Sequence, residues 1–293
     1  MLARICGRYP ALHSPESFTD FMSNPIQAGG TTPDGCPNDP TAPCRQDVRR
    51  GWLVHCATAL GAVCGMLGII SVIDDAPKAA LLWLIAAQVL DGLDGPVARA
   101  WNVQTSVPRI DGYILDLIID FVTCAVVPIL FMYKFHMLPA HTSLIMGAFL
   151  LFSSALWFSR TDMMTADHWF NGFPSVWNLA VPTMFLVQGA NPTSLNHWIN
   201  LAVLLILALS QLTNLKFVHP VQVRKFRVLT LSFFVAWLAA MLWLTILLPG
   251  DVSLVLRIVL IVPGLYQLGL MVWRTFFAAQ TDGPAAQRVL LDS

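Results

Sequence analysis

Long apolar segments separated by short polar breaks make up most of the chain from Trp52 onward. A membrane-spanning helix needs about 20 predominantly apolar residues, because the hydrocarbon core of a bilayer is about 30 Å thick. Eight candidate segments are found, at approximately 52–73, 79–100, 112–133, 142–159, 174–189, 197–214, 228–248 and 253–276. The pattern predicts an all-α fold, a polytopic membrane helix bundle of about eight transmembrane helices.

The two ends of the chain differ from this apolar region. Residues 1–48 are rich in Pro, Gly, Ser, Thr and Asn and contain no long apolar run. Such a composition cannot bury a core, so we expect a disordered N-terminal tail. Residues 49–279 are predicted to form one membrane domain, and residues 280–293 a short C-terminal tail.

Basic residues are concentrated on one side of the predicted bundle. With the N-terminal tail in the cytoplasm, the opposite side holds only Lys78, Lys134 and Arg257. By the positive-inside rule, both termini are predicted to be cytoplasmic, which in a bacterium means the inner membrane. The net charge of zero indicates no basic face for nucleic acid.

Four aspartates lie in segments that should cross the membrane. Asp91 and Asp94 are three residues apart in the second segment, and Asp116 and Asp120 are four apart in the third. Each pair therefore shares a helix face. A carboxylate at mid-membrane costs about 2.5–3.5 kcal/mol on insertion scales, so four of them need compensation. A single such aspartate would suggest a proton relay or a helix-pairing hydrogen bond.

If the two faces meet, four carboxylates surround one cavity near the cytoplasmic side. Oxygen donors without His or Cys suit Mg²⁺ or Mn²⁺, one or two of which would offset the repulsion and bind a diphosphate. Gly92, Gly95, Ala98 and Gly112 leave room for a bulky nucleotide or for close helix approach. Arg99 ends the second segment, where it can reach phosphate or extend to the membrane surface.

The spacing Asp91-x2-Asp94-Gly95-x2-Ala98-Arg99 … Gly112-x3-Asp116-x3-Asp120 resembles the defining motif of the CDP-alcohol phosphotransferases. The gap between Arg99 and Gly112 is longer than usual and is similar to that of the phosphatidylcholine synthase branch. Segments Phe170–Asn178 and Lys216–Arg224 also resemble loops of that branch. The resemblance covers roughly residues 51–276.

The resemblance implies an enzyme that transfers the phosphatidyl group of CDP-diacylglycerol to choline and releases CMP. By the same resemblance, Asp91, Asp94 and Asp116 hold a pair of divalent cations. Asp120 helps to hold metal and acts as general base. The residues that border CDP-diacylglycerol are Gly95, Ala98, Arg99 and Gly112. Most members pair as homodimers, so a homodimer is expected.

The acceptor can also be considered from its chemistry. A quaternary ammonium has no N–H to donate and suits the faces of aromatic rings. Phe170, Phe173 and Trp177 lie in the branch-specific loop and are predicted to form the choline pocket, although interfacial anchoring is an alternative role. Serine, glycerol 3-phosphate and inositol remain alternative acceptors. An ion-binding transporter is the alternative from another class, but we find neither inverted repeats nor paired broken helices.

Overall fold

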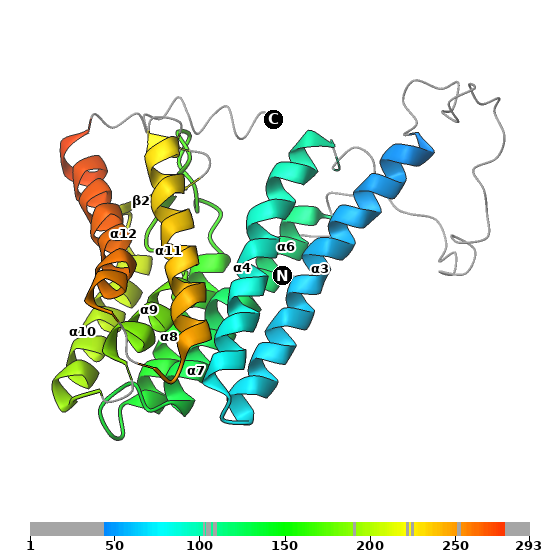
Figure 1. Cartoon of the computed structure of the whole chain (residues 1–293). Coiled ribbons are helices and arrows are strands. Elements are labelled where there is room, and N and C mark those ends of the chain that lie inside the picture. Colours follow the sequence, from blue (N-terminus) through cyan, green and yellow to red (C-terminus); the bar gives the residue numbers. More distant parts are fainter. Residues whose placement is uncertain are drawn as a thin grey trace.

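The computed structural model of the chain describes residues 44–101, 103, 107, 110–189, 192–220, 223, 226–250 and 253–278. Most of the predicted N-terminal tail (residues 1–43) and the predicted C-terminal tail (280–293) lie outside these ranges. The described part is a bundle of helices that stand side by side (Figure 1).

Each of the eight predicted apolar segments is helical. In chain order the elements are α3 (Arg45–Ile73), α4 (Pro77–Ala100), α6 (Gly112–Asp120), η1 (Phe121–Val126), α7 (Val127–Lys134), α8 (Ser143–Phe158), β1 (Trp169–Asn171), α9 (Trp177–Gln188), α10 (Ser194–Gln211), β2 (Lys216–Val218), α11 (Arg227–Leu247), α12 (Leu254–Val272) and η3 (Trp273–Phe277). The third predicted segment is continuous through α6, η1 and α7, where η1 is a π-helical turn.

Six helices among the described residues are long and apolar enough to cross a membrane. The protein is therefore a multi-pass membrane protein. The other two helices are shorter: α8 has 16 residues and α9 has 12. At about 1.5 Å per residue they extend about 24 and 18 Å, less than the hydrocarbon thickness of about 30 Å. Helix α9 starts at Trp177, later than predicted, because Ser175 takes a positive φ angle. It ends at Gln188, and the following Gly189 also has a positive φ angle.

Three glycines bring α3 close to the third segment. A methyl group added at Gly61 would lie 2.8 Å from Ile119, and one at Gly65 would lie 2.9 Å from Val122. At Gly68 the corresponding distance to Val127 is 3.1 Å. Small residues allow membrane helices to pack with their backbones close together. This packing fixes α6 against α3.

The main hydrophobic core draws on most of the helices, including Val72 of α3 and Leu81 of α4. Phe131 of α7, Trp177 of α9, Leu204 of α10 and Met241 of α11 are almost completely buried in it. Helices α3 and α4 run beside each other at the edge of the bundle (Figure 1). The buried residues of α4 all lie between Ala80 and Ala87, so Asp91 lies beyond the part of α4 that enters this core.

A small sheet interrupts the otherwise all-α fold. Strands β1 and β2 pair antiparallel, with Trp169 opposite Val218 and Asn171 opposite Lys216. The two segments that separately resemble loops of one enzyme branch are thus bonded to each other. Arg160 fixes the adjoining loop, since its Nη1 donates to the carbonyl of Thr213 over 3.0 Å.

One end of the bundle gathers several helix ends. The start of α3, the end of α4, the start of α11 and the end of η3 lie at the same end of the molecule (Figure 1). The basic residues near these helix ends are Arg49, Arg50, Arg99, Arg227 and Arg274. The arrangement agrees with the one-sided distribution of charge that the sequence predicts.

Candidate active site

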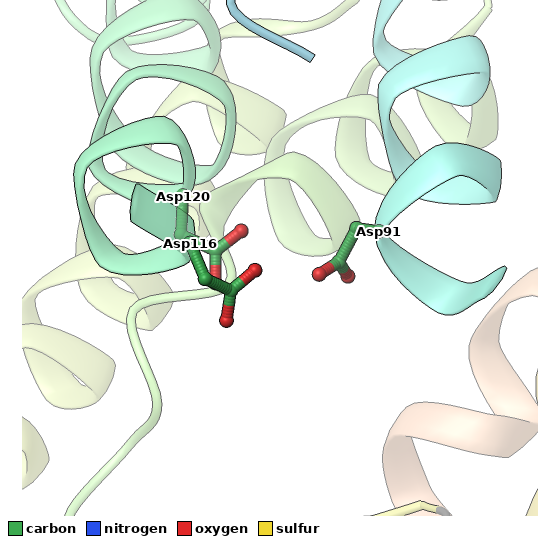
Figure 2. Close-up of side chains that lie close together, drawn as sticks. All are labelled: Asp91, Asp116 and Asp120. Carbon is green, nitrogen blue, oxygen red and sulfur yellow. The ribbon is translucent and has the colours of Figure 1, made fainter. Parts of the chain in front are cut away.

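Three of the four predicted aspartates converge between α4 and α6. Asp91, Asp116 and Asp120 each place a carboxylate oxygen within 4.8 Å of the others, and all three are half-buried. Figure 2 shows Asp91 projecting from α4 toward the two side chains of α6. We call these three residues the acidic cluster.

Asp94, the fourth predicted ligand, is not part of this cluster. Its Oδ2 accepts a 2.6 Å hydrogen bond from Thr58 Oγ1 on α3. The Thr58 hydroxyl also lies 3.2 Å from the carbonyl oxygen of Val54. Asp94 is thus held toward α3, one helical turn beyond Asp91.

Polar neighbours hold two members of the acidic cluster. Gln88 Nε2 donates to Asp91 Oδ2 over 3.2 Å, and the Cys124 thiol lies 3.9 Å from Asp120 Oδ1. Asp120 is the last residue of α6, directly before the π-helical turn η1. Such turns occur frequently at functional sites.

The N-terminus of α6 has its own capping residue. Asp111 Oδ1 accepts from the backbone N–H groups of Tyr113 and Ile114, over 3.0 and 3.2 Å. A side chain that caps a helix in this way typically stabilises it by about 1 kcal/mol. The cap fixes the start of α6 one turn before Asp116.

The acidic cluster has the donor chemistry of a cation site. In the part of the chain that the structure describes, no Lys, Arg or His forms an ion pair with any of its three carboxylates. Carboxylates so close together repel one another unless a cation or protons intervene. Oxygen donors are the ligands that Mg²⁺ and Mn²⁺ prefer, so the cluster is compatible with a divalent cation.

Space next to the aspartates is provided by glycine. A methyl group at Gly92 would meet no atom within 4 Å, and one at Gly95 would lie 3.3 Å from Nη1 of Arg99. The exposed Arg99 side chain thus folds back over Gly95, while Ala98 is half-buried. Gly112 has a different neighbour, since a methyl group there would lie 3.0 Å from Cε1 of His55.

The loop after β2 lies close enough to Arg99 for their charges to interact. Burial lowers the pKa of His219 to about 4, and the positive charges of Arg99 and His168 contribute to the shift. His219 is therefore neutral at physiological pH. Its ring stacks on Phe170, with the ring centroids 5.0 Å apart and an interplanar angle of 24°.

The three predicted choline-pocket residues differ in exposure. Phe170 is half-buried, and its ring centroid lies 5.8 Å from that of Trp157. Phe173 and Trp177 are buried in the main core with ring centroids 4.9 Å apart. Trp177 Nε1 donates to Ser154 Oγ over 2.8 Å. Phe170 is thus the one of the three that is not fully buried.

Three polar residues near the site were not predicted from the sequence: Thr58, Gln88 and Asn178. Gln88 carries a recognisable signal, because it lies three residues before Asp91 and so shares its helix face. Thr58 and Asn178 carry none. Their hydrogen-bond partners lie 36 and 90 residues away in sequence.

Comparison with known proteins places the chain in a family. Phosphatidylcholine synthase from Pseudomonas aeruginosa is 36% identical over 226 residues, which cover 77% of this chain and 92% of the relative. The chain belongs to the phosphatidylcholine synthase family. The phosphatidylcholine synthase of Brucella melitensis is 34% identical over 218 residues (74% of this chain, 76% of the relative). That of Mesorhizobium japonicum is 32% identical over 190 residues (65% and 69%).

No family model matches the chain. Membership of the phosphatidylcholine synthase family nevertheless confirms the branch that the sequence resembles.

Proposed function

We propose that the protein transfers the phosphatidyl group of CDP-diacylglycerol to choline and releases CMP. The observation that carries this proposal is the acidic cluster of Asp91, Asp116 and Asp120, placed between two helices of a chain from the phosphatidylcholine synthase family. The two parts of the motif come from separate helices and still meet, as a shared site requires.

The lipid substrate has an apolar tail and a polar head, and the site offers surroundings for both. The acyl chains would remain in the bilayer beside the helices. The cytidine diphosphate would occupy the open side of α4 at Gly92 and Gly95, bordered by Ala98 and Gly112. The Arg99 guanidinium, whose Nη1 lies next to Gly95, would pair with phosphate oxygens.

The carboxylates have two tasks in this proposal. Asp91, Asp116 and Asp120 would hold one divalent cation, and Asp94 would join them to hold a second. Mg²⁺ or Mn²⁺ bound there supplies charge neutralisation for the diphosphate and for departing CMP. Asp120 would also take the proton from the acceptor hydroxyl, as a general base does.

The proposed reaction is a direct displacement at phosphorus. The choline oxygen forms a bond to the phosphorus of the phosphatidyl group, and the bond from that phosphorus to the CMP oxygen breaks. CMP leaves with the bonding electron pair, and the hydroxyl proton passes to Asp120. The sequence shows no Ser–His or Cys–His nucleophile motif, so a covalent enzyme intermediate is not invoked.

Phe170 is the central residue of the proposed choline pocket, whereas Phe173 and Trp177 are buried in the main core. Each aromatic face can contribute up to about 2 kcal/mol to binding of a desolvated quaternary ammonium. The stacked His219 is neutral and so does not repel the cation. A carboxylate could also balance the charge of the ammonium group, but Asp167, the acid nearest to Phe170 in sequence, pairs with Arg274 over 3.0 Å.

The alternatives differ in what they require of the site. Serine and glycerol 3-phosphate carry an anionic group and call for additional cations in the pocket, while inositol calls for many hydrogen-bonding side chains. An ion-binding transporter would use the same carboxylates without releasing CMP. Phe170, stacked on a neutral histidine, favours choline among these.

We also propose in which membrane the protein lies, how it is oriented there and that it forms a dimer. The one-sided distribution of basic residues favours the bacterial inner membrane with both termini and the active site in the cytoplasm. The resemblance to the wider enzyme class favours a homodimer. Residues 49–279 are proposed to contain everything that the chemistry requires.

The test is release of CMP from CDP-diacylglycerol by the purified full chain in detergent. Choline, serine, glycerol 3-phosphate and inositol are offered separately, each with Mg²⁺ or Mn²⁺ and again with excess chelator. We expect release with choline and a divalent cation, and none after chelation. Release only with another acceptor would overturn the choline assignment. Full turnover after confirmed metal removal would overturn the metal-assisted mechanism.

A further inference from the structure

A chain of two side-chain amides connects α9 to the acidic cluster. Asn178, in the first turn of α9, donates from Nδ2 to Gln88 Oε1 over 2.5 Å. Gln88, in α4, donates from Nε2 to Asp91 Oδ2 over 3.2 Å. Asn178 is only 4% exposed, and Gln88 is half-buried.

The direction of this chain is fixed by its acidic end. An ionised carboxylate only accepts hydrogen bonds, so Gln88 must turn its NH₂ group toward Asp91. Its carbonyl oxygen then faces Asn178, which must present its own NH₂ group.

The bond to Gln88 explains the orientation of Asn178. The other polar atom of its side chain, Oδ1, is buried and has no hydrogen-bond partner among the described residues. Burying a polar atom without a hydrogen-bond partner costs free energy of folding. The contact with Gln88 is thus the one that holds the Asn178 amide within the described structure.

The effect on Asp91 is to restrict its carboxylate. Asp91 Oδ2 is held by Gln88, while the side chain points across to Asp116 and Asp120 (Figure 2). Groups that hydrogen-bond to metal-binding carboxylates fix their orientation, and their removal typically lowers metal affinity 10- to 100-fold.

We propose that Gln88 and Asn178 are positioning residues that aim the Asp91 carboxylate at the cation site. This inference rests on the proposed function, because it assigns the two amides a role at the same site. It adds that α9 is connected to the acidic cluster through Gln88. Helix α9 follows the segment that carries Phe170 of the proposed choline pocket, and its first turn is hydrogen-bonded through Gln88 to the cation site.

The test measures Mn²⁺ binding to the purified full chain in detergent, by electron paramagnetic resonance without substrate. The variants are Gln88→Leu, Asn178→Leu and the double variant. We expect each single variant to weaken Mn²⁺ binding about tenfold or more. Because Asn178 acts on Asp91 only through Gln88, the double variant should bind Mn²⁺ no more weakly than Gln88→Leu does. Asn178→Asp should also bind Mn²⁺ more weakly, because its carboxylate cannot donate to Gln88.

Helix α9 provides a matched control at its other end. Gln188 donates from Nε2 to Asn200 Oδ1 over 2.5 Å, which is also an amide pair between helices. Gln188→Leu should lower the thermal stability and leave the Mn²⁺ affinity unchanged. If Asn178→Leu behaves in the same way as Gln188→Leu, the positioning role is wrong and the contact is only structural.

The proposed function and this inference fail differently. If the unmodified protein neither binds Mn²⁺ nor releases CMP, the proposed function is wrong and the inference is lost with it. If the unmodified protein does both and all the variants bind Mn²⁺ as it does, only the positioning role is overturned.

Discussion

Thr58 donates a 2.6 Å hydrogen bond to Asp94, and this contact ties α3 to the acidic face of α4. The two residues are 36 positions apart, on helices that run side by side. Asp94 is therefore held by α3, while Asp91 on the same face of α4 points to α6. Three aspartates of the motif therefore lie together between α4 and α6, and the fourth, Asp94, contacts α3.

Replacing Thr58 with Val should reduce turnover, because it removes the hydroxyl that donates to Asp94 and keeps the shape of the side chain. A hydrogen bond to a charged group contributes about 1.5–3 kcal/mol, so kcat/KM for CDP-diacylglycerol should fall by about tenfold or more. Thr58→Ser should retain most of the activity. Ser71→Ala is the control, because Ser71 donates only to Leu67 of its own helix. Equal kinetics for Thr58→Val and the unmodified protein would show that Asp94 needs no such support.

Asp120→Asn should impair the chemical step more than substrate binding. An amide cannot accept the hydroxyl proton, and general base catalysis typically contributes about 10²- to 10⁴-fold. We therefore expect a loss in kcat within that range and a smaller change in the affinity for CDP-diacylglycerol, measured by equilibrium binding. Asp75→Asn is the control, since Asp75 lies in the turn between α3 and α4 and pairs with Lys134 at the end of α7. Near-normal turnover by Asp120→Asn would remove Asp120 from the role of base.

Phe170→Leu should raise the KM for choline and leave the KM for CDP-diacylglycerol nearly unchanged. Loss of one aromatic face removes up to about 2 kcal/mol, which corresponds to at most about a thirtyfold increase in KM. Phe170→Tyr keeps an aromatic ring at this position and should have the KM for choline of the unmodified protein. Phe152→Leu, on an exposed position of α8, controls for loss of an aromatic side chain elsewhere. An unchanged choline KM in Phe170→Leu would place the pocket elsewhere.

Two glycine-to-alanine changes should have opposite effects on stability. The added methyl at Gly61 would lie 2.8 Å from Ile119, and such overpacking typically costs about 1–3 kcal/mol. At Gly92 the added methyl meets nothing, and Ala favours a helix by about 1 kcal/mol over Gly. Thermal unfolding in one detergent should therefore show a lower midpoint for Gly61→Ala and no decrease for Gly92→Ala. The reverse order would contradict the described packing of α3.

The half-buried imidazole of His219 should make stability depend on pH. Its folded pKa of about 4 lies below the ordinary value near 6.5, so between these values the unfolded chain binds more protons than the folded one. Stability should fall as the pH decreases from 6.5 toward 4, with no effect of this residue above 6.5. His219→Phe retains a ring for stacking on Phe170 and removes the titration. Its thermal midpoint should decrease less over that range, and parallel curves for both proteins would contradict the assignment.

Much of the fold could be read from local sequence. The eight apolar runs predicted the eight helices, because a membrane admits few structures other than helices that satisfy their own backbone hydrogen bonds. The length of α9 was overestimated, since the positive φ angles at Gly172 and Ser175 belong to a loop that apolar composition does not reveal. The pairing of β1 with β2 was also missed, because its partners are far apart in sequence.

The sequence by itself determined the helices and the one-sided distribution of basic residues. It also determined the spacing within each pair of aspartates, because Asp91 and Asp94, and likewise Asp116 and Asp120, are about one helical turn apart. These features follow from helical periodicity and from the free-energy cost of charge in lipid, both of which act locally. Only the tertiary structure decided that Asp91 joins the two acids of α6, while Asp94 bonds to Thr58 and Asn178 reaches Gln88. Those contacts depend on how close the helices approach, which glycines such as Gly61 set through packing between distant parts of the chain.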